Sequence, residues 1–270
     1  MGEGLTYRGT TALVTGATKG LGRALAEELA ARGANLVLLA RSRAALDELA
    51  DELRARTGVT ARVIAADLTD RASRRAALAE LGEQPIDLLL NNAGAGSVGP
   101  FLDTPLAEHV DSIALNVEAL TELTHHVARS MRRAGTGTIV NVGSTAGYLP
   151  VPYQASYGAT KAYVRSFTEA LRVELRGTGV RVVAVNPGAI RTAFFDGKDV
   201  TIDPRAYDTP ERVARDVLDH VRSGRAVSIP GMKANAAMIA VASLLPMRVR
   251  ARVMAVLNRA LGFDRLGAVE

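Results

Sequence analysis

The stretch TGATKGLG, Thr15 to Gly22, follows a short apolar run and opens a segment with the pattern of an amphipathic helix. The glycines at 16, 20 and 22 permit a tight turn and a close approach of the backbone to a pyrophosphate. Such a group would lie against the amides at the positive end of the helix. A glycine trio in a loop is often only a turn, but this strand-to-helix setting favours dinucleotide binding.

Apolar runs and helical segments alternate along the rest of the chain. The apolar runs lie at 11–16, 35–41, 61–68, 86–94, 137–144, 181–188 and 226–231. The helical segments lie at 21–33, 42–57, 70–81, 105–133, 154–179 and 209–224. The runs are nearly all apolar and do not alternate, as in strands buried on both faces, and several helical segments close on glycine. This predicts an α/β fold: a single doubly wound (Rossmann) domain of about seven parallel strands with helices on both faces.

Composition fits one domain of this kind. The chain has 270 residues, of which 48% are hydrophobic and 23% charged, and neither a linker nor a repeat divides it. We expect the dinucleotide-binding and catalytic domain over 1–231 and a C-terminal amphipathic helical extension of it over 232–270. The absence of cysteine excludes disulfides, thiolate chemistry and zinc–cysteine sites.

The chain start lacks the apolar region of a signal peptide, although Gly2 and Thr6 match the short myristoylation pattern, which often arises by chance. The longest apolar run, 236–247, is too short to span a bilayer. A cytoplasmic protein, at most membrane-associated, is therefore expected. The net charge is +5, but the arginines are scattered and only 4% of residues are aromatic, which argues against a nucleic-acid partner.

The end of the second apolar run indicates which dinucleotide binds. An acidic residue about 20 residues after the last glycine would bind the ribose 2′-hydroxyl of NAD. Arg41 stands there instead, and it can pair with a 2′-phosphate, with Ser42 and Lys19 in support. We therefore expect NADP(H). The competing interpretation is that Arg41 and Arg43 are solvated charges at a helix start.

The stretch YGATK, Tyr157 to Lys161, places a phenol and an ammonium on one helix face. Of the six tyrosines, only Tyr157 has a lysine or arginine four residues later. A free tyrosine has a pKa of about 10, and nearby positive charge from an ammonium and a nicotinamide ring favours its phenolate. A shift of about three units needs roughly 4 kcal/mol, so the pair is expected to lie in a partly desolvated cleft.

These motifs together resemble the short-chain dehydrogenase/reductase family from Thr10 to Gly231. The resemblance rests on TGATKGLG, on NNAG at Asn91 to Gly94, on Ser144 thirteen residues before Tyr157, and on NPG at Asn186 to Gly188. It implies that Tyr157 is the catalytic acid/base, Lys161 its partner, Ser144 a hydrogen-bond donor to the substrate carbonyl, and Asn116 the holder of a proton-relay water.

The resemblance also extends the cofactor site beyond the glycine loop. It implies adenine-side contacts from Asp67 and Leu68, a lining from Asn91 to Gly94, and nicotinamide contacts from Pro187 to Ile190 and Thr192. The expected cofactor residues are Gly16, Thr18, Lys19, Gly20, Leu21, Gly22, Arg41, Ser42, Asp67, Leu68, Asn91, Ala93, Gly94, Tyr157, Lys161, Pro187, Gly188, Ile190 and Thr192. No metal site is expected, because the four histidines lack the H-E-x-x-H spacing.

The expected reaction is reduction of a ketone to a secondary alcohol, or its reverse, on a hydrophobic or lipid-like substrate. A serine hydrolase is disfavoured because GSTAG is not the G-x-S-x-G nucleophile elbow. A non-catalytic NADP-binding sensor or regulatory protein on the same fold stays open, since fold and cofactor loop alone do not establish turnover. Asn116, Ser144, Tyr157 and Lys161 together favour the enzyme.

Two segments are candidates for substrate recognition. Phe194 and Phe195, beside glycine and proline, are typical of a mobile lid over an apolar ligand or of ordinary packing. The tail interleaves Arg248, Arg250, Arg252 and Arg259 with valine and leucine. It could lie on a membrane, cover a lipophilic substrate, or pack on the domain or on another subunit. A homodimer or homotetramer is expected from the family resemblance.

Overall fold

The computed structural model of the chain describes residues 6–192, 207–228 and 244–265. Its centre is a seven-stranded parallel sheet of order β3-β2-β1-β4-β5-β6-β7. The strands are β1 (Thr11–Thr15), β2 (Asn35–Ala40), β3 (Ala61–Ala65), β4 (Leu88–Asn91), β5 (Gly137–Val142), β6 (Val180–Val185) and β7 (Val227–Ser228). The order reverses between β1 and β4, the point at which doubly wound sheets bind ligands. The predicted fold is confirmed.

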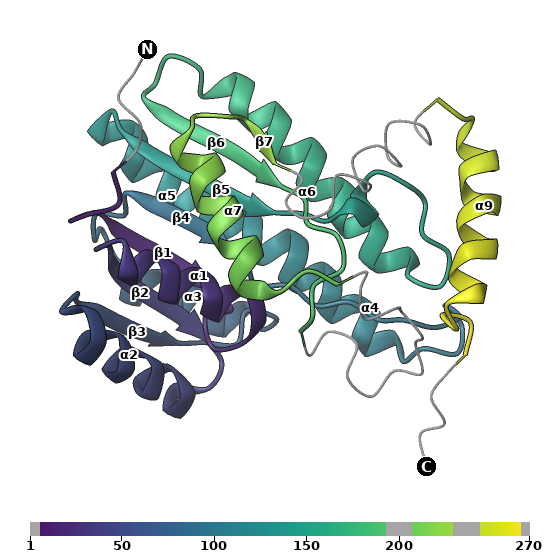
Figure 1. Ribbon diagram of the computed structural model, residues 1–270, viewed down its shortest axis with the longest axis horizontal. Coiled ribbons are helices and arrows are strands. Elements are labelled where there is room, and N and C mark those ends of the chain that lie inside the picture. The colour runs from purple at the N-terminus through teal and green to yellow at the C-terminus, as the bar shows by residue number, and fades with distance from the viewer. Residues whose placement is uncertain (1–5, 193–206, 229–243, 266–270) are drawn as a thin grey trace.

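Helices cover both faces of the sheet, as Figure 1 shows. They are α1 (Gly20–Ala31), α2 (Arg43–Thr57), α3 (Arg71–Leu81), α4 (Leu106–Ile113), α5 (Leu120–Ala134), α6 (Ala155–Glu174), α7 (Pro210–Arg222) and α9 (Met247–Ala260). Adjacent strand residues face opposite layers. Val14 packs in a core with residues of α1, α2 and α7, whereas Leu13 packs in a second core with residues of α3 and α5. The strands are therefore buried on both sides.

The segment predicted as one helix over 105–133 is interrupted. A π-helical turn, η1 (Ala114–Ala119), joins α4 to α5 and carries Asn116. Such turns insert one residue into a helix and are frequent at functional sites. A single inserted residue leaves the apolar pattern almost unchanged, so the sequence pattern did not reveal it.

Helix α9 lies beyond the end of the sheet at which β5 and β6 terminate (Figure 1). Its Asn258 amide donates to the Pro152 carbonyl at 2.8 Å, and Arg259 Nε donates to the Tyr153 hydroxyl at 2.6 Å. The tail is therefore anchored on the segment that precedes α6. Most of the apolar run 236–247 lies outside the described residues. Within the described parts of the chain, no helix is long and apolar enough to cross a membrane.

Candidate active site

The glycine loop between β1 and α1 has the geometry that its sequence predicts. Gly16 and Gly20 adopt positive φ angles of 66° and 51°, which L side chains rarely adopt. A Cβ at Gly22 would lie 2.1 Å from the Gly16 carbonyl oxygen, so no side chain fits there. Lys19 precedes α1 without a side-chain cap, which leaves the first amides of the helix open to an anion.

Next to this loop, the end of β2 carries two exposed arginines with different partners. Arg43 Nε pairs with Asp47 at 2.9 Å, four residues along α2. Within the described residues no carboxylate lies at ion-pairing distance from Arg41. Ser42 uses its hydroxyl to cap α2 by accepting from the Ala45 amide at 3.3 Å. Arg43 thus fits the interpretation as a helix-start charge, whereas Arg41 remains available to a ligand.

Asp67 faces Arg41 at the end of β3. Hydrogen bonds from the Thr69 hydroxyl at 2.7 Å and the Thr69 amide at 2.9 Å hold the pKa of Asp67 below its ordinary value, and the charge of Arg41 adds to this. The Asp67 carboxylate is therefore ionised and its Oδ1 is already occupied. Arg41 and Asp67 are therefore near enough to interact electrostatically.

The NNAG segment divides into a structural and a cavity-lining part. Asn91 is buried, and its amide donates to Thr124 Oγ1 and Asn141 Oδ1, both at 2.9 Å, so its side chain faces the core rather than a cofactor. Asn92 lines the cavity instead, and its Nδ2 donates to the Thr15 carbonyl at 2.9 Å. Successive side chains along a strand point to opposite faces of the sheet, so Asn91 points into the core and Asn92 into the cavity.

The four predicted catalytic side chains converge from three elements. Ser144 follows β5, Tyr157 and Lys161 lie on the first turns of α6, and Asn116 lies in η1. Hydrogen bonding from the Ser144 side chain acts to lower the pKa of Tyr157, so the two hydroxyls lie next to each other. Lys161 Nζ donates to the Val142 carbonyl at 2.9 Å and lies 5.7 Å from the centre of the Tyr157 ring. A Cβ at Gly94 would lie 3.1 Å from Asn116 Oδ1 and 3.3 Å from Lys161 Nζ, which places Asn116 beside Lys161.

The Asn116 side chain is occupied by protein groups. Its Nδ2 lies 2.7 Å from the Ala95 carbonyl and 2.9 Å from Thr160 Oγ1, and its Oδ1 accepts from the Ala95 amide at 3.0 Å. The amide therefore fixes the loop at Ala95 against α6. The side chain has little hydrogen-bonding capacity left, and the role of Asn116 in holding a relay water stays a prediction.

Burial dominates the electrostatics of this pair. It lowers the pKa of Lys161 to about 8 and raises the pKa of Tyr157, while the hydrogen bond with Ser144 acts in the opposite direction on Tyr157. The polypeptide by itself therefore keeps the phenol protonated. The expectation that the ammonium and a nicotinamide ring together favour the phenolate concerns the protein with its cofactor and stays a prediction.

These side chains open into a cavity of about 590 Å³. The predicted residues Leu21, Gly94, Ser144, Tyr157, Lys161, Pro187, Gly188, Ile190 and Thr192 line it. Its other wall is apolar and comes from two separate segments. The wall residues are Leu149, Val151, Met254, Leu257, Leu261 and Phe263. Of the predicted roles for the tail, covering the cavity agrees with this placement, whereas Phe194 and Phe195 lie outside the described residues.

The wall at 149–153 had no signal in the sequence, since it belongs to neither a motif nor a periodic segment. Tyr153, inside it, adopts a positive φ of 68°. Its carbonyl accepts from the Gly99 amide at 2.9 Å and its ring lies under the Arg259 guanidinium. A non-glycine residue in this region is strained, and contacts from two other segments hold it.

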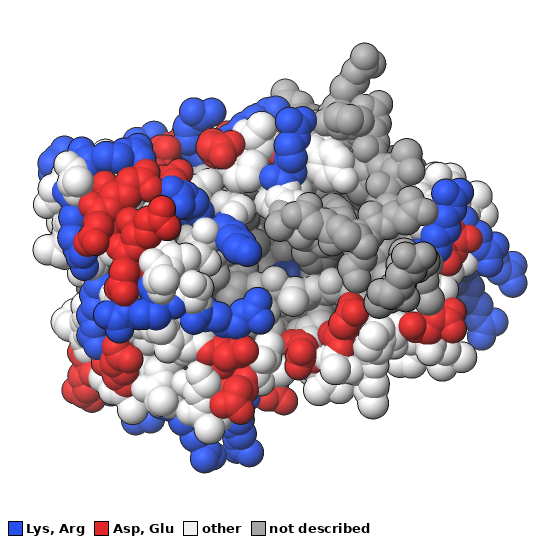
Figure 2. Space-filling model, turned by 90° about the horizontal axis from the view of Figure 1, so that it is seen from below, with Lys and Arg blue, Asp and Glu red and all other residues white. Residues whose placement is uncertain are grey.

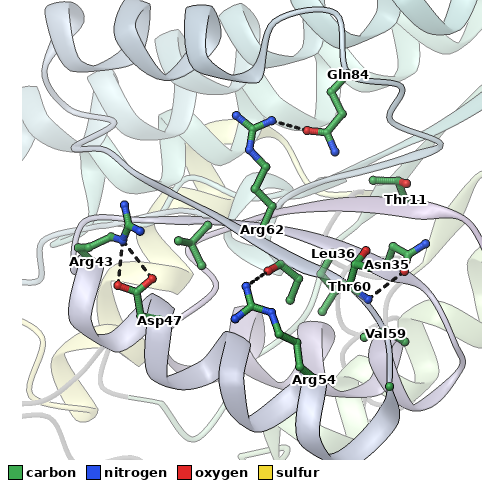
Figure 3. A pocket seen from close by; sticks show the side chains of 13 residues that line it. Thr11, Asn35, Leu36, Arg43, Asp47, Arg54, Val59, Thr60, Arg62 and Gln84 are labelled. Carbon is green, nitrogen blue, oxygen red and sulfur yellow. Dashed lines mark hydrogen bonds and ion pairs between the residues drawn. The ribbon is translucent and has the colours of Figure 1, made fainter.

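A second hollow, of about 850 Å³, follows the outer edge of β3 and is drawn in Figure 3. Its polar side chains are bonded to the surrounding protein: Arg43 to Asp47, Arg62 to Gln84, and Arg54 to the Ala61 carbonyl. Such contacts protect a free strand edge from pairing. This hollow carries no candidate acid/base pair, so the cavity beside Tyr157 is the candidate active site.

The described residues contain no cluster of three histidine or acidic side chains placed to hold a metal ion. On the face in Figure 2, acidic and basic side chains are interspersed among the described residues around a central hollow. The charge that can be seen there is therefore mixed in sign.

Comparison with known proteins agrees with the residues that converge here. A family model described as short chain dehydrogenase matches residues 10–201. The chain belongs to the short-chain dehydrogenase family, a class of oxidoreductases, as its motifs predicted.

Individual relatives differ in their substrates. The chain is 40% identical over 215 residues to sulfoacetaldehyde reductase 2 of Chromohalobacter salexigens. The aligned region covers 77% of this chain and 84% of that relative. It resembles the structure of a short-chain dehydrogenase from Sphingobium yanoikuyae in complex with NADPH, with a TM-score of 0.79, 32% identity, and coverage of 97% and 98%. It also resembles the structure of a bulky-bulky ketone specific alcohol dehydrogenase from Comamonas testosteroni, with a TM-score of 0.76 and 32% identity. That match covers 97% of this chain and 96% of the other.

Proposed function

We propose that the protein reduces a hydrophobic ketone to a secondary alcohol with NADPH. The observation that carries this proposal is the juxtaposition of the Ser144–Tyr157 pair with an apolar cavity walled by α9. A carbonyl would enter with its oxygen toward the two hydroxyls and its hydrocarbon groups toward Leu149, Val151 and Met254. The likeness to a ketone-specific alcohol dehydrogenase supports this choice of substrate.

The residues present fit NADP(H). The Gly16–Gly22 turn is packed too tightly for a side chain at Gly22, and the α1 amides beside it have no side-chain cap. Arg41 makes no ion pair at close distance among the described residues and would pair with the 2′-phosphate. When bound, the nicotinamide supplies the hydride. The NADPH complex of a similar protein supports the assignment.

The chain's own residues would handle the oxygen and the proton. Ser144 donates a hydrogen bond to the carbonyl oxygen, which polarises it toward hydride attack. Tyr157 donates its proton to the same oxygen as negative charge develops there. Lys161, held by the Val142 carbonyl, keeps its charge next to the phenol and stabilises the phenolate that remains.

The protonation state of Tyr157 favours reduction over oxidation at neutral pH. Reduction needs a phenol that carries a proton, and burial raises the pKa of Tyr157 in the free protein. Oxidation needs the phenolate, so it requires higher pH or the positive ring of the oxidised cofactor. The same residues serve reduction and oxidation, but in the free protein Tyr157 is in the protonated form that reduction needs.

A sulfonated aldehyde is a weaker candidate, despite the relative that bears that activity. A sulfonate in a buried pocket needs a cationic partner. Among the described residues that line the cavity, Lys161 is the one cation, and it is committed to Val142 and Tyr157. The described wall offers hydrocarbon where the sulfonate would lie.

The first test is Tyr157→Phe, assayed with NADPH and a panel of aliphatic and polycyclic ketones by absorbance at 340 nm. We expect kcat to fall by about 10³-fold or more, since the proton donor is lost. NADPH affinity, measured by fluorescence titration, should change little. A variant that keeps its reductase activity would refute the mechanism. Intact NADPH binding with no ketone reduced by the unaltered protein would favour the non-catalytic sensor.

The second test is Arg41→Ala, with kinetics in NADPH and in NADH. The variant loses the cation for the 2′-phosphate, so we expect kcat/KM for NADPH to fall about 10- to 100-fold while that for NADH changes little. Arg43→Ala is the matched control, because Arg43 is paired with Asp47. Unaltered protein that prefers NADH would overturn the assignment.

Two finer proposals concern assembly. A homodimer or homotetramer is supported by exposed apolar side chains around α4, namely Phe101, Leu102, Leu106, Val110 and Ile113. Light scattering tests this. A peripheral membrane contact is supported by Met247, Val253 and Val256, exposed beside Arg248 and Arg252 on α9. Co-sedimentation with anionic vesicles tests that contact.

A further inference from the structure

His109 is a buried histidine on α4 that the proposed chemistry does not use. Only 6% of the residue is exposed, and its ring stacks on Phe101 with the two ring centres 4.5 Å apart. It is not one of the residues that line the cavity beside Tyr157. Both of its ring nitrogens are nevertheless engaged, so their partners show what this imidazole holds in place.

The His109 imidazole contacts three residues through its two nitrogen atoms. Nε2 lies 3.2 Å from the Phe101 carbonyl oxygen, which can only accept, so we assign the ring hydrogen to Nε2. In the neutral ring Nδ1 is then the acceptor. It lies 2.9 Å from Ser156 Oγ and 3.3 Å from Ser97 Oγ. One imidazole thus connects the 97–101 segment to the first turn of α6.

The residues next to these two serines pack against each other. Ser97 follows Gly96, and Ser156 precedes Tyr157. A Cβ at Gly96 would lie 2.5 Å from Cδ2 and 2.8 Å from Cγ of Tyr157, so the Gly96 main chain lies directly on the phenol ring. His109 therefore binds the residue beside Gly96 and the residue beside Tyr157, and so holds the two sides of this contact together.

The loop that carries Gly96 is anchored on both sides of that contact. Before it, the Ala95 carbonyl accepts from Ser112 Oγ of α4 at 3.0 Å and from Asn116 Nδ2 at 2.7 Å. After it, the Gly99 amide donates to the Tyr153 carbonyl at 2.9 Å. The hydroxyl that binds His109 comes from the middle of the loop, between these anchors. His109 therefore fixes the part of the loop that lies on the phenol.

The orientation of the Tyr157 ring decides where its hydroxyl lies. Gly96 contacts the ring near Cγ and Cδ2, whereas the hydroxyl lies next to Ser144. If the loop moves off the ring, the ring gains freedom and its hydroxyl moves out of line with the substrate oxygen. A displacement of about 1 Å can lower a rate by about 10²-fold. The glycine loop between β1 and α1 is not among the contacts of His109, so cofactor binding should not depend on them.

We propose that His109 is a positioning residue for the proton donor, because it holds the Gly96 loop against the Tyr157 ring through Ser97 and Ser156. This inference rests on the proposed ketone reduction, in which Tyr157 is the acid. It adds a residue outside the cavity on which the alignment of that acid depends. The nitrogen atoms of His109, rather than the bulk of its ring, carry this role.

The test compares His109→Phe with His109→Asn. Phenylalanine keeps a ring that stacks on Phe101 and removes both nitrogens, whereas asparagine loses the ring and keeps an acceptor near the place of Nδ1. With undecan-6-one and saturating NADPH we expect kcat to fall about tenfold or more in His109→Phe and to stay within about threefold in His109→Asn. The Kd of NADPH, from fluorescence titration, should change little in either. A role in packing alone gives the opposite order of kcat values, and that order would overturn the inference.

Two further variants keep the test decisive if His109→Phe folds poorly. Ser156→Ala removes the 2.9 Å contact to Nδ1 with a small change in volume, and we expect kcat to fall about three- to tenfold. His126→Phe is the matched control, since His126 on α5 also binds a main-chain carbonyl, that of Gly82 at 2.8 Å. Its kcat should match that of the unaltered protein. An unchanged kcat in Ser156→Ala, or an equal loss in His126→Phe, would contradict the role of His109.

A measurement without turnover separates this inference from the proposed reaction. Protein grown with 3-fluorotyrosine gives a fluorine NMR signal for each tyrosine ring, and Tyr157→Phe identifies the signal of Tyr157. We expect that signal to shift or broaden in His109→Phe and to stay in place in His109→Asn. If the unaltered protein reduces no ketone, the proposed reaction fails, while the altered signal still supports His109 as the residue that fixes this ring. An unchanged signal in His109→Phe overturns the inference whether or not turnover occurs.

Discussion

The cofactor half and the substrate half of the cavity are built in different ways. The cofactor half is contiguous in sequence, since Gly16 to Gly22 form one turn whose geometry depends on the absence of side chains. The substrate half joins Leu149 to Gln154 with Met254 to Phe263, about a hundred residues later. Local backbone chemistry therefore specifies the first half, whereas side-chain contacts between distant segments specify the second.

The largest effect should come from a side chain placed in the glycine loop. Gly22→Val puts carbon atoms where the Cβ alone would lie 2.1 Å from the Gly16 carbonyl oxygen. The loop must then move off the pyrophosphate, and we expect NADPH affinity to fall by about 100-fold or more. Fluorescence titration measures this. Gly58→Val is the control, since no atom lies within 4 Å of its Cβ position.

The comparison of Gly22→Val with Gly58→Val tests the cofactor site through NADPH affinity and not through protein stability. Gly58 has a positive φ of 72°, so Gly58→Val introduces backbone strain and lowers stability as well, whereas Gly22→Val introduces a steric clash. NADPH affinity should fall in Gly22→Val alone. Unchanged affinity in Gly22→Val would contradict the view that backbone geometry fixes the cofactor half.

A smaller effect, on the pH dependence of stability, is expected at Lys161, where the cofactor half and the substrate half of the cavity meet. Burial lowers its pKa from 10.5 to about 8, so between these values the unfolded chain binds more protons than the folded one and stability rises with pH. Below pH 8 the folded state bears the full free-energy cost of burying the charged Lys161 ammonium, about 3 kcal/mol. Relative to Lys161→Met, the unaltered protein should therefore gain about 3 kcal/mol between pH 7.5 and pH 10.5.

Urea unfolding of both proteins without cofactor, at several pH values, measures that change. Contact energies that do not titrate cancel in the comparison, including the lost hydrogen bond to Val142. A difference between the proteins that stays constant with pH would show that Lys161 is not desolvated as its surroundings indicate.

The smallest effect should come from loosening α9. Asn258→Ala removes the hydrogen bond to the Pro152 carbonyl and so weakens the anchor of the apolar wall. We expect KM for undecan-6-one to rise about three- to tenfold, while a small ketone such as butan-2-one, which does not reach α9, changes little. Steady-state kinetics with saturating NADPH measures this.

Arg248→Ala, on the exposed side of α9, serves as the control and should leave both KM values near those of the unaltered protein. Equal changes for the long and the short ketone in Asn258→Ala would mean that α9 does not form the substrate wall. Cofactor affinity should stay constant, which separates the two halves of the cavity.

Sequence alone located most of the reacting groups. The glycine loop, Ser144, Tyr157 and Lys161 are visible because each sits at a fixed distance from a strand or helix end, and parallel strands bring those ends to one edge of the sheet. Asn91 was predicted to contact the cofactor as part of the segment 91–94, and its side chain binds Thr124 and Asn141 in the core. One position along a strand reverses the direction of a side chain, and a motif does not state where the strand ends.

The sequence by itself determined the doubly wound α/β class, the glycine loop and the position of the acid/base pair, because hydrophobic periodicity and glycine spacing act over a few residues. Only the tertiary structure decided that burial keeps Tyr157 protonated, that η1 interrupts the helix at Asn116, and that α9 walls the cavity. Desolvation depends on all surrounding atoms, and the α9 wall depends on Asn258 and Arg259 meeting partners about a hundred residues away. Neither is a property of a local stretch of chain.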